Sequence, residues 1–269
     1  TTPSRTTPSP ERCPVMHDLD LFAVAELIAG AKRLVVLTGA GISTDSGIPD
    51  FRGPDGIWTK DPDAERLSTI DYFMSSSAAR TKHWWNEFYI NLTSFEPNDG
   101  HRAIAALKPR TIITQNIDGL HQRAGSISVL EMHGTVHTSS CTDCGKSFKT
   151  ENVLFAMLMG RTNDPHCDEG GCEGVVKRDI VMFGEDLNPQ VWSAAESAAT
   201  SADVMLCVGS TLSVFPVAAL PGVTKEMGGK VVIVNDGRTE FDSRAAYVLR
   251  GSASDILSQL VKVIQTNGC

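Results

Sequence analysis

The feature that most constrains the fold is an alternation of short apolar runs with helical patterns. Three runs read LVVLTG at residues 34–39, ADVMLCVGS at 202–210 and KVVIVND at 230–236. They are rich in β-branched residues and end at glycine or polar residues, which is typical of strands buried on both faces. Because helical patterns separate such strands, the sequence predicts an α/β fold with a doubly wound parallel sheet.

Weaker patterns complete the predicted order of elements. We expect further strands at 110–116, 127–134 and 178–185, and helices at 19–33, 102–109, 191–202, 216–227 and 252–265. Residues 57–97 are expected to form a loop and short helices that carry many aromatic side chains. The Thr-, Pro- and Ser-rich residues 1–14 predict a flexible tail.

Charge and hydropathy exclude several classes of protein. A net charge of −8 disfavours nucleic-acid binding and favours a basic or lysine-bearing partner. No apolar signal region is visible near the first residue. The uncharged stretch 204–224 has membrane-like length, but glycines and prolines interrupt it, which favours a strand, a turn and a short helix. We therefore expect a cytoplasmic monomer without a membrane span.

Two closely spaced glycines, Gly39 and Gly41, follow the first strand. Glycine lets a backbone approach a pyrophosphate closely, so strand, glycine turn and helix start together predict a dinucleotide site. A dehydrogenase site also needs a third glycine, and an acid at the end of a second strand about 20 residues on. Asp61 and Asp63 lie near that distance but not in a strand pattern, so ordinary hydride transfer is disfavoured.

Polar residues also follow the other predicted strands. Because the carboxyl ends of parallel strands meet at one edge of a sheet, these clusters are expected to line a single crevice. Their members are Gln115, Asn116, Asp118, His133, Gly209, Ser210, Thr211, Asn235 and Asp236.

Four of the seven cysteines form two closely spaced pairs, Cys141 with Cys144 and Cys167 with Cys172. Two such thiolate pairs, separated by glycine-rich turns, favour a tetrahedral Zn²⁺ site. Four thiolates leave no open position for a substrate, so the prediction is one structural zinc. Cys207, inside an apolar strand, is predicted to be a buried hydrophobic residue.

Several motifs, in this order, resemble the sirtuin family in its bacterial form. They are GAGISTDSGIPDFRG at 39–53, TQNIDGLHQRAG at 114–125, EMHG at 131–134, the two cysteine pairs, IVMFGE at 180–185, VGSTLSVFP at 208–216 and IVN at 233–235. The resemblance covers about residues 20–260. It implies an NAD-dependent protein lysine deacylase that releases nicotinamide and O-acyl-ADP-ribose from acyl-lysine proteins.

The resemblance also implies two domains. A Rossmann-like NAD-binding domain would comprise residues 15–56, 98–135 and 179–269. A small domain, made of a helical module and a zinc ribbon, would comprise 57–97 and 136–178. Acyl-lysine would enter between them.

Site residues are assigned by the same resemblance. His133 would be the general base toward a ribose hydroxyl, with Asn116 and Asp118 as further catalytic residues. The implied NAD contacts are Gly39, Ala40, Gly41, Ser43, Asp50, Phe51, Arg52, Gln115, Asn116, Asp118, Gly209, Ser210, Thr211, Asn235, Asp236 and Ala253. The implied acyl-lysine and peptide contacts are Val181, Phe183, Gly184, Glu185 and Val214.

Two positions bear on how this chain departs from its relatives. The family often has proline where this chain has Arg178, which could alter the hinge between the domains. Sirtuins that prefer succinyl-lysine resemble one another in a Tyr-x-x-Arg pair, but Tyr89 is followed at that spacing by Leu92. An acidic acyl group would then lack a cation in an apolar channel, so we expect neutral acyl groups, acetyl first.

Two other functions remain open at this stage. Protein mono-ADP-ribosyl transfer would use the same NAD site with another nucleophile. A zinc-ribbon scaffold would bind acylated protein or nucleic acid without turnover, although the acidic residues around the cysteines disfavour nucleic acid.

Overall fold

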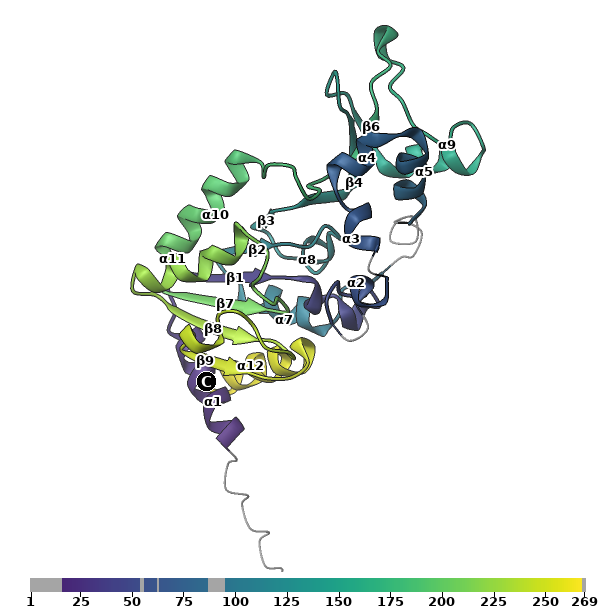
Figure 1. Ribbon diagram of the computed structural model, residues 1–269. Helices are drawn as coiled ribbons and strands as arrows, with labels where there is room; N and C mark the ends of the chain where they lie inside the picture. Colours follow the sequence, from purple (N-terminus) through teal and green to yellow (C-terminus); the bar gives the residue numbers. More distant parts are fainter. Residues whose placement is uncertain (1–15, 54–55, 62, 87–94, 268–269) are drawn as a thin grey trace, which may run out of the picture.

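The computed structural model describes residues 16–53, 56–61, 63–86 and 95–267, and the fold has a larger and a smaller part (Figure 1). The expected tail at 1–14 and the Tyr89–Leu92 pair both lie outside the described residues.

A six-stranded parallel sheet forms the centre of the larger part. Its strands lie in the order β3-β2-β1-β7-β8-β9. They span β1 (Leu34–Thr38), β2 (Thr111–Thr114), β3 (Val129–Glu131), β7 (Val204–Val208), β8 (Lys230–Val234) and β9 (Tyr247–Leu249). The predicted doubly wound α/β class is thus confirmed, and this strand order is that of a Rossmann sheet. Strand β9 was not predicted, because its three residues are too few for a periodic signal.

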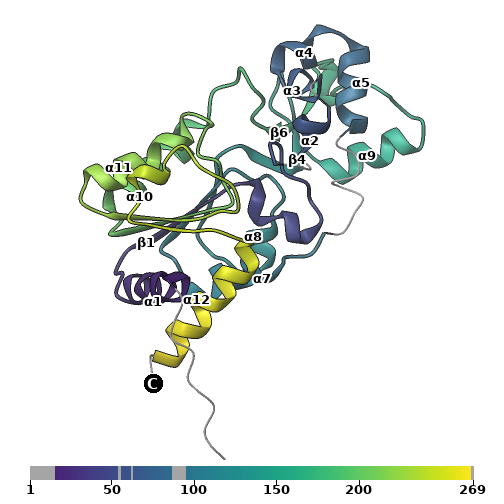
Figure 2. The same ribbon diagram turned by 60° about the horizontal axis from the view of Figure 1, so that its bottom comes forward.

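Helices cover both faces of this sheet (Figure 2). One face packs on α1 (Met16–Ala29), α7 (Asp99–Leu107) and α12 (Ala253–Asn267), and the other on α10 (Pro189–Ser201) and α11 (Leu220–Glu226). Alternate residues of β1 divide between the two cores, since Val36 faces the first and Val35 and Leu37 face the second. Cys207 belongs to the second core and is buried, as predicted.

Short helical segments occupy the loops of the larger part. They are η1 (Ala40–Ile42), η2 (Thr44–Ser46), α8 (Leu120–Arg123), η4 (Val217–Ala219) and η5 (Asp242–Arg244). None of the helices within the described part of the chain has the length and apolar character that a membrane span requires.

The smaller part combines a three-stranded antiparallel sheet with helices. Its strands, in the order β5-β4-β6, are β4 (Gly134–Cys141), β5 (Ser147–Lys149) and β6 (Val176–Ile180). Its helices are α2 (Ile57–Lys60), α3 (Asp63–Leu67), α4 (Ile70–Ser75), α5 (Ser77–Asn86), α9 (Thr150–Leu158) and η3 (Glu169–Gly171). A separate core that contains Phe73, Trp84 and Met182 holds these elements together.

One predicted strand lies in the other sheet. We expected residues 178–185 to join the parallel sheet, but β6 ends at Ile180 and pairs antiparallel with β4. An apolar run predicts that a strand is buried but does not indicate which strand it pairs with, which explains why this strand was assigned to the wrong sheet. The predicted boundary between residues 178 and 179 therefore falls inside β6, and the rest of the domain division stays a prediction.

Arg178 is a buried member of β6. Its guanidinium lies 4.5 Å from the centre of the Trp84 ring, and Nη2 donates to the Trp84 carbonyl at 3.3 Å. The departure from proline thus gives the small sheet a cationic contact with the last turn of α5, where helix carbonyls favour positive charge.

Candidate active site

A large cleft opens at the carboxyl ends of the parallel strands. It has a volume of about 1780 Å³, well above the ~300–1,000 Å³ typical of a site for one small ligand. Its floor lies where β1 and β7 are neighbours, which is the point where the strand order reverses. Doubly wound sheets bind their ligands at this point.

All the residues predicted to contact cofactor or substrate line this one cleft. They are Gly39, Ala40, Gly41, Ser43, Asp50, Phe51, Arg52, Gln115, Asn116, Asp118, His133, Val181, Phe183, Gly184, Glu185, Gly209, Ser210, Thr211, Val214, Asn235, Asp236 and Ala253. The predicted convergence of the strand-end clusters is confirmed, while the role of each residue stays a prediction.

The loops after β1 and β7 touch backbone to backbone. Gly41 N–H donates to the Gly209 carbonyl at 2.8 Å, and Gly39 N–H donates to the Val208 carbonyl at 3.0 Å. A Cβ on Gly41 would lie 2.9 Å from the Gly209 Cα. These two N–H groups therefore bond within the protein. Glycine is required at both positions because the two loops pack so closely together.

Replacing Gly209 with alanine is expected to destabilise the fold by about 2 kcal/mol or more. Gly209 has φ +59°, and an added Cβ would lie 2.4 Å from the Ile42 nitrogen. Gly237, on the same rim of the cleft, has no neighbour within 4 Å of an added Cβ. Urea denaturation should therefore show a large loss in the free energy of unfolding for Gly209→Ala and little change for Gly237→Ala. Equal losses in the two variants would contradict the packing argument.

Ser43, Asn116 and Asp118 form a hydrogen-bonded cluster on the cleft wall. Ser43 Oγ donates to Asp118 Oδ2 at 2.7 Å, and Asn116 Nδ2 donates to Ser43 Oγ at 3.0 Å. Ser43 is buried, so these bonds lie largely out of water. The cluster presents an oriented amide and a carboxylate to a ligand.

Buried histidines behind this cluster were not predicted. His101 Nε2 lies 3.5 Å from Ser43 Oγ, and the two rings of His101 and His121 are in edge contact at 4.9 Å. Asn98 caps the start of α7 and accepts a hydrogen bond from His101 Nδ1 at 3.1 Å. Asn98 before a helical pattern was a readable capping signal, but neither histidine lies in a pattern that reveals its partners.

Acid is expected to destabilise the protein through these two histidines. Burial lowers the pKa of His121 to about 3, and burial, partly opposed by Asp118, lowers the pKa of His101 to about 4. Below the ordinary pKa of about 6.5 the unfolded chain binds protons that the folded chain excludes. Stability is thus full above that pH and falls below it, by up to about 1.4 kcal/mol per pH unit for each histidine.

Urea denaturation between pH 7 and pH 5 tests this expectation. His121→Gln should reduce the slope of unfolding free energy against pH relative to the wild type. An unchanged slope in His121→Gln would contradict the assignment.

His133 enters the cleft as a neutral, oriented imidazole. Its Nδ1 lies 3.0 Å from the Gln115 carbonyl oxygen, which can only accept, so Nδ1 carries the proton. Nε2 is then the basic nitrogen, and among the described residues it has no hydrogen-bond partner. Burial lowers the pKa of His133, and the bond to Gln115 partly offsets the effect. The ring is therefore ready to accept a proton at neutral pH.

Glu185 lines the cleft, but its carboxylate is used within the protein. Oε2 accepts from the Met182 N–H at 2.8 Å and pairs with Lys177 Nζ at 3.0 Å. Lys177 Nζ also donates to the Ile180 carbonyl at 2.6 Å. The Glu185 N–H donates to the Met182 carbonyl at 3.0 Å, so the side chain and the N–H of Glu185 both fix the shape of residues 180–185.

An aromatic group covers one side of the cleft. The ring of Trp58 lies 4.8 Å from that of Phe51 and 5.5 Å from that of Phe183. The guanidinium of Arg52 stacks on Trp58 at 4.4 Å, and its Nη2 lies 3.9 Å from Glu65. These contacts join the loop after η2 to the segment after β6.

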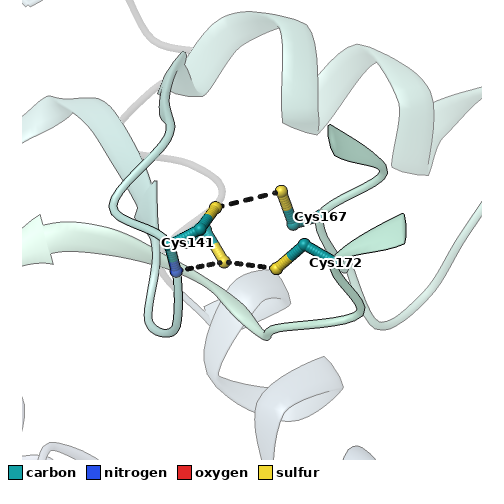
Figure 3. Close-up of side chains that lie close together, drawn as sticks. Cys141, Cys167 and Cys172 are labelled. Atoms are coloured by element: carbon teal, nitrogen blue, oxygen red, sulfur yellow. Dashed lines mark hydrogen bonds between the residues drawn. The ribbon is translucent and has the colours of Figure 1, made fainter. Parts of the chain in front are cut away.

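The four paired cysteines come together in the smaller part, and Figure 3 labels three of them, Cys141, Cys167 and Cys172. All four Sγ atoms lie within 4.8 Å of one another, and the Cys141–Cys172 and Cys144–Cys167 distances are both 3.7 Å. A tetrahedral zinc with bonds of about 2.3 Å requires about 3.8 Å between sulfurs, so the cluster fits this metal.

The turns around the cysteines also suit thiolates. Backbone N–H groups of Asp143 and Cys144 donate to Cys141 Sγ at 3.4 and 3.5 Å. Positive φ at Gly170 and Gly171 accommodates the longer spacing of the second pair. Four thiolates would complete a tetrahedral shell with no open position, and the cluster lies apart from the residues lining the cleft, which indicates a structural metal.

The fold and cleft together define a Rossmann-type nucleotide-binding protein with a cysteine-cluster metal site in a second, smaller part. Residues 39–216 match the family model described as the Sir2 family, and the chain belongs to that family.

Curated relatives and solved structures support the assignment to this family. The chain is 40% identical over 241 residues to NAD-dependent protein deacetylase 2 of Streptomyces coelicolor, covering 87% of this chain and 99% of the relative. It is 38% identical over 249 residues to the NAD-dependent protein deacetylase of Saccharolobus solfataricus, covering 90% and 96%.

Two solved structures are similar over 91% of this chain and 98% of theirs. One is described as Sir2 with a p53 peptide and NAD+, with a TM-score of 0.80 and 34% identity. The other is described as Sir2 bound to acetylated peptide, with a TM-score of 0.79 and 33% identity.

Proposed function

We propose that this chain is an NAD-dependent protein deacetylase acting on acetyl-lysine in proteins. One observation carries the proposal: a neutral imidazole, whose Nε2 has no hydrogen-bond partner among the described residues, lies in the same cleft as the glycine loops of a nucleotide-binding sheet. A binding module would have no need for a base held in one tautomer. The curated relatives carry the same activity in their names.

NAD, when bound, supplies a glycosidic bond whose nicotinamide can leave, so that the acetyl group can pass to the ribose. The residues of the chain are proposed to orient the dinucleotide around that bond. Ala40, Gly41, Ser43 and Thr211 would hold the pyrophosphate region, with Arg52 near the phosphates. Phe51, which lines the cleft beside Trp58, would exclude water from the nicotinamide.

Asn116 and Asp118 are proposed to face the ribose. Their bonds to Ser43 fix both side chains before any ligand binds. Preorganised dipoles and a carboxylate stabilise positive charge on the sugar as the leaving group departs, without reorganisation at the moment of reaction.

His133 is proposed to accept a proton at Nε2 from a ribose hydroxyl. The Gln115 carbonyl holds the opposite ring nitrogen, so the ring need not change tautomer before it acts. Loss of the hydroxyl proton makes the oxygen nucleophilic toward the acyl carbon.

The peptide is proposed to lie along residues 181–185 and Val214, on the side of the cleft facing the smaller part. Neutral acyl groups are expected to be preferred, acetyl first, although Tyr89 and Leu92 lie outside the described residues. The proposal includes a monomer that does not bind nucleic acid. It also includes a reducing compartment such as the cytoplasm, in which the four thiols stay available to a metal.

Nicotinamide release tests the proposal. With NAD and an acetyl-lysine peptide the protein should release nicotinamide and deacetylated peptide in equal amounts, and without the peptide the release should be small. Radiolabel from the adenosine of NAD should leave as a small acylated product. Label that stays on protein would instead indicate mono-ADP-ribosyl transfer, and binding without nicotinamide release would indicate a scaffold.

A further inference from the structure

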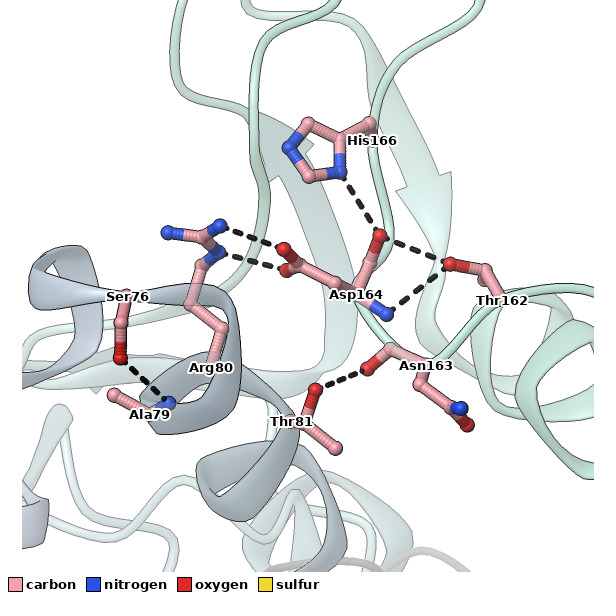
Figure 4. A network of polar contacts seen from close by, with 8 residues as sticks. All are labelled: Ser76, Ala79, Arg80, Thr81, Thr162, Asn163, Asp164 and His166. Atoms are coloured by element: carbon pink, nitrogen blue, oxygen red, sulfur yellow. Dashed lines mark hydrogen bonds and ion pairs between the residues drawn. The ribbon is translucent and has the colours of Figure 1, made fainter.

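A partly buried ion pair joins the loop before Cys167 to helix α5 (Figure 4). Arg80 of α5 donates from Nε and Nη2 to the two carboxylate oxygens of Asp164, at 2.7 and 2.6 Å. The neighbouring Thr81 Oγ1 donates to the Asn163 carbonyl at 2.8 Å. The two charged side chains are only 12% and 14% exposed, so water and salt screen this bidentate pair far less than a surface pair.

The loop that carries Asp164 also carries Cys167, a member of the cysteine cluster. Cys167 follows three residues later, and its N–H donates to the Gly174 carbonyl at 2.8 Å. The Pro165 carbonyl accepts from the Val176 N–H of β6 at 3.0 Å. A displacement of the cysteine ligands would therefore move the carboxylate that holds α5.

One helical turn after Arg80, α5 also reaches the cleft. His83 lines the cleft and packs edge-on against Phe73 of α4, with ring centres 5.2 Å apart. The start of α4 is bonded to the cleft wall, since Ile70 N–H donates to the Phe183 carbonyl and Phe183 N–H donates to the Ser68 carbonyl, both at 3.0 Å. A continuous set of packed and hydrogen-bonded groups thus runs from the cysteine cluster to Phe183.

We propose that the Arg80–Asp164 ion pair couples metal binding at the cysteine cluster to acyl-lysine binding in the cleft. Arg80 is a positioning residue, because it touches neither ligand and acts through α5. The coupling is reciprocal by thermodynamic linkage: bound metal tightens peptide binding, and bound peptide slows metal loss. The peptide half of this inference rests on the proposed function, whereas the metal half does not.

Arg80→Met is the primary variant. The contact between Arg178 and Trp84 still holds the last turn of α5, so the variant is expected to fold. Arg80→Lys keeps the charge but not the fork that matches a carboxylate, and should rescue part of the effect. Lys149→Met is the matched control, because the Lys149–Glu151 pair lies in the same part of the fold but is about three-quarters exposed.

Zinc-loaded enzymes would be mixed with a chromogenic zinc chelator, and the release rate measured with and without acetyl-lysine peptide. Release from Arg80→Met should be about tenfold faster than from the wild type, as expected for a lost charge-assisted contact of ~1.4 kcal/mol. Peptide should slow release from the wild type and Lys149→Met but not from Arg80→Met. Steady-state kinetics should show a higher KM for peptide in Arg80→Met and an unchanged KM for NAD.

The proposal would be overturned if Arg80→Met released zinc at the same rate as the wild type. Equal rises in the KM for peptide and in the KM for NAD would also overturn it. If Arg80→Met does not fold, Asp164→Asn, which keeps the side-chain volume, gives the same readouts. If the wild type does not deacetylate the peptide, the proposed function fails, and the zinc-release rates without peptide still decide whether Arg80 retains the metal.

Discussion

His133→Ala is expected to lower kcat for deacetylation by about 10²–10⁴-fold, the usual contribution of a positioned general base. The dinucleotide should still bind with nearly unchanged affinity, because the imidazole is not one of the proposed phosphate contacts. Nicotinamide release should suffer less than deacetylation, since His133 is proposed to act on a ribose hydroxyl after nicotinamide has left. Product quantification under single-turnover conditions, with calorimetry for NAD, measures these quantities.

The pH profile gives an independent test of the same residue. Because burial lowers the pKa of His133, the base stays deprotonated below pH 6.5, and the acid limb of kcat/KM should have its midpoint below that value. Lys149→Met, at an exposed residue that does not line the cleft, serves as the control and should retain the wild-type profile. Deacetylation by His133→Ala within tenfold of the wild type would rule out this residue as the base.

Cys167→Ala is expected to abolish stoichiometric zinc binding and to unfold the smaller part of the protein. A structural zinc site contributes on the order of 10 kcal/mol, which exceeds what a three-stranded sheet and its short helices can supply alone. The six-stranded sheet has its own two cores and should stay folded. Metal analysis and thermal unfolding should therefore show no zinc and a separate, earlier loss of structure.

The matched control for this variant is Cys207→Ala. Cys207 is buried in β7 and lies outside the cysteine cluster, so the control should keep one zinc per chain. Its loss of stability should be about 1 kcal/mol, as expected for a small cavity in a packed core. A Cys167→Ala protein that kept its zinc and its unfolding profile would refute the structural-metal assignment.

Local patterns predicted the features that depend on local chemistry. The apolar runs located five of the six parallel strands, and the glycines after β1 and β7 marked the point where the strand order reverses. The cysteine spacing identified the metal cluster before its geometry was known. Each of these signals lies within a few neighbouring residues.

Features that depend on distant partners were missed or misassigned. The antiparallel pairing of β6 with β4 joins residues about 40 positions apart, and the hydrophobic pattern of β6 carries no information on that partner. His101 and His121 meet only because α7 and α8 pack together. The Glu185 carboxylate is likewise held by Lys177. No local pattern in the sequence predicts that these two residues form an ion pair.

The placement of Cys207 supplies a built-in reporter of unfolding. Burial raises the pKa of its thiol and shields the sulfur from reagents in solution. Alkylating reagents should reach the thiols of the cluster once the metal is removed, whereas the thiol in β7 should react only when the central sheet opens. Mass spectrometry that counts labelled thiols per molecule therefore separates local demetallation from global denaturation in a single sample.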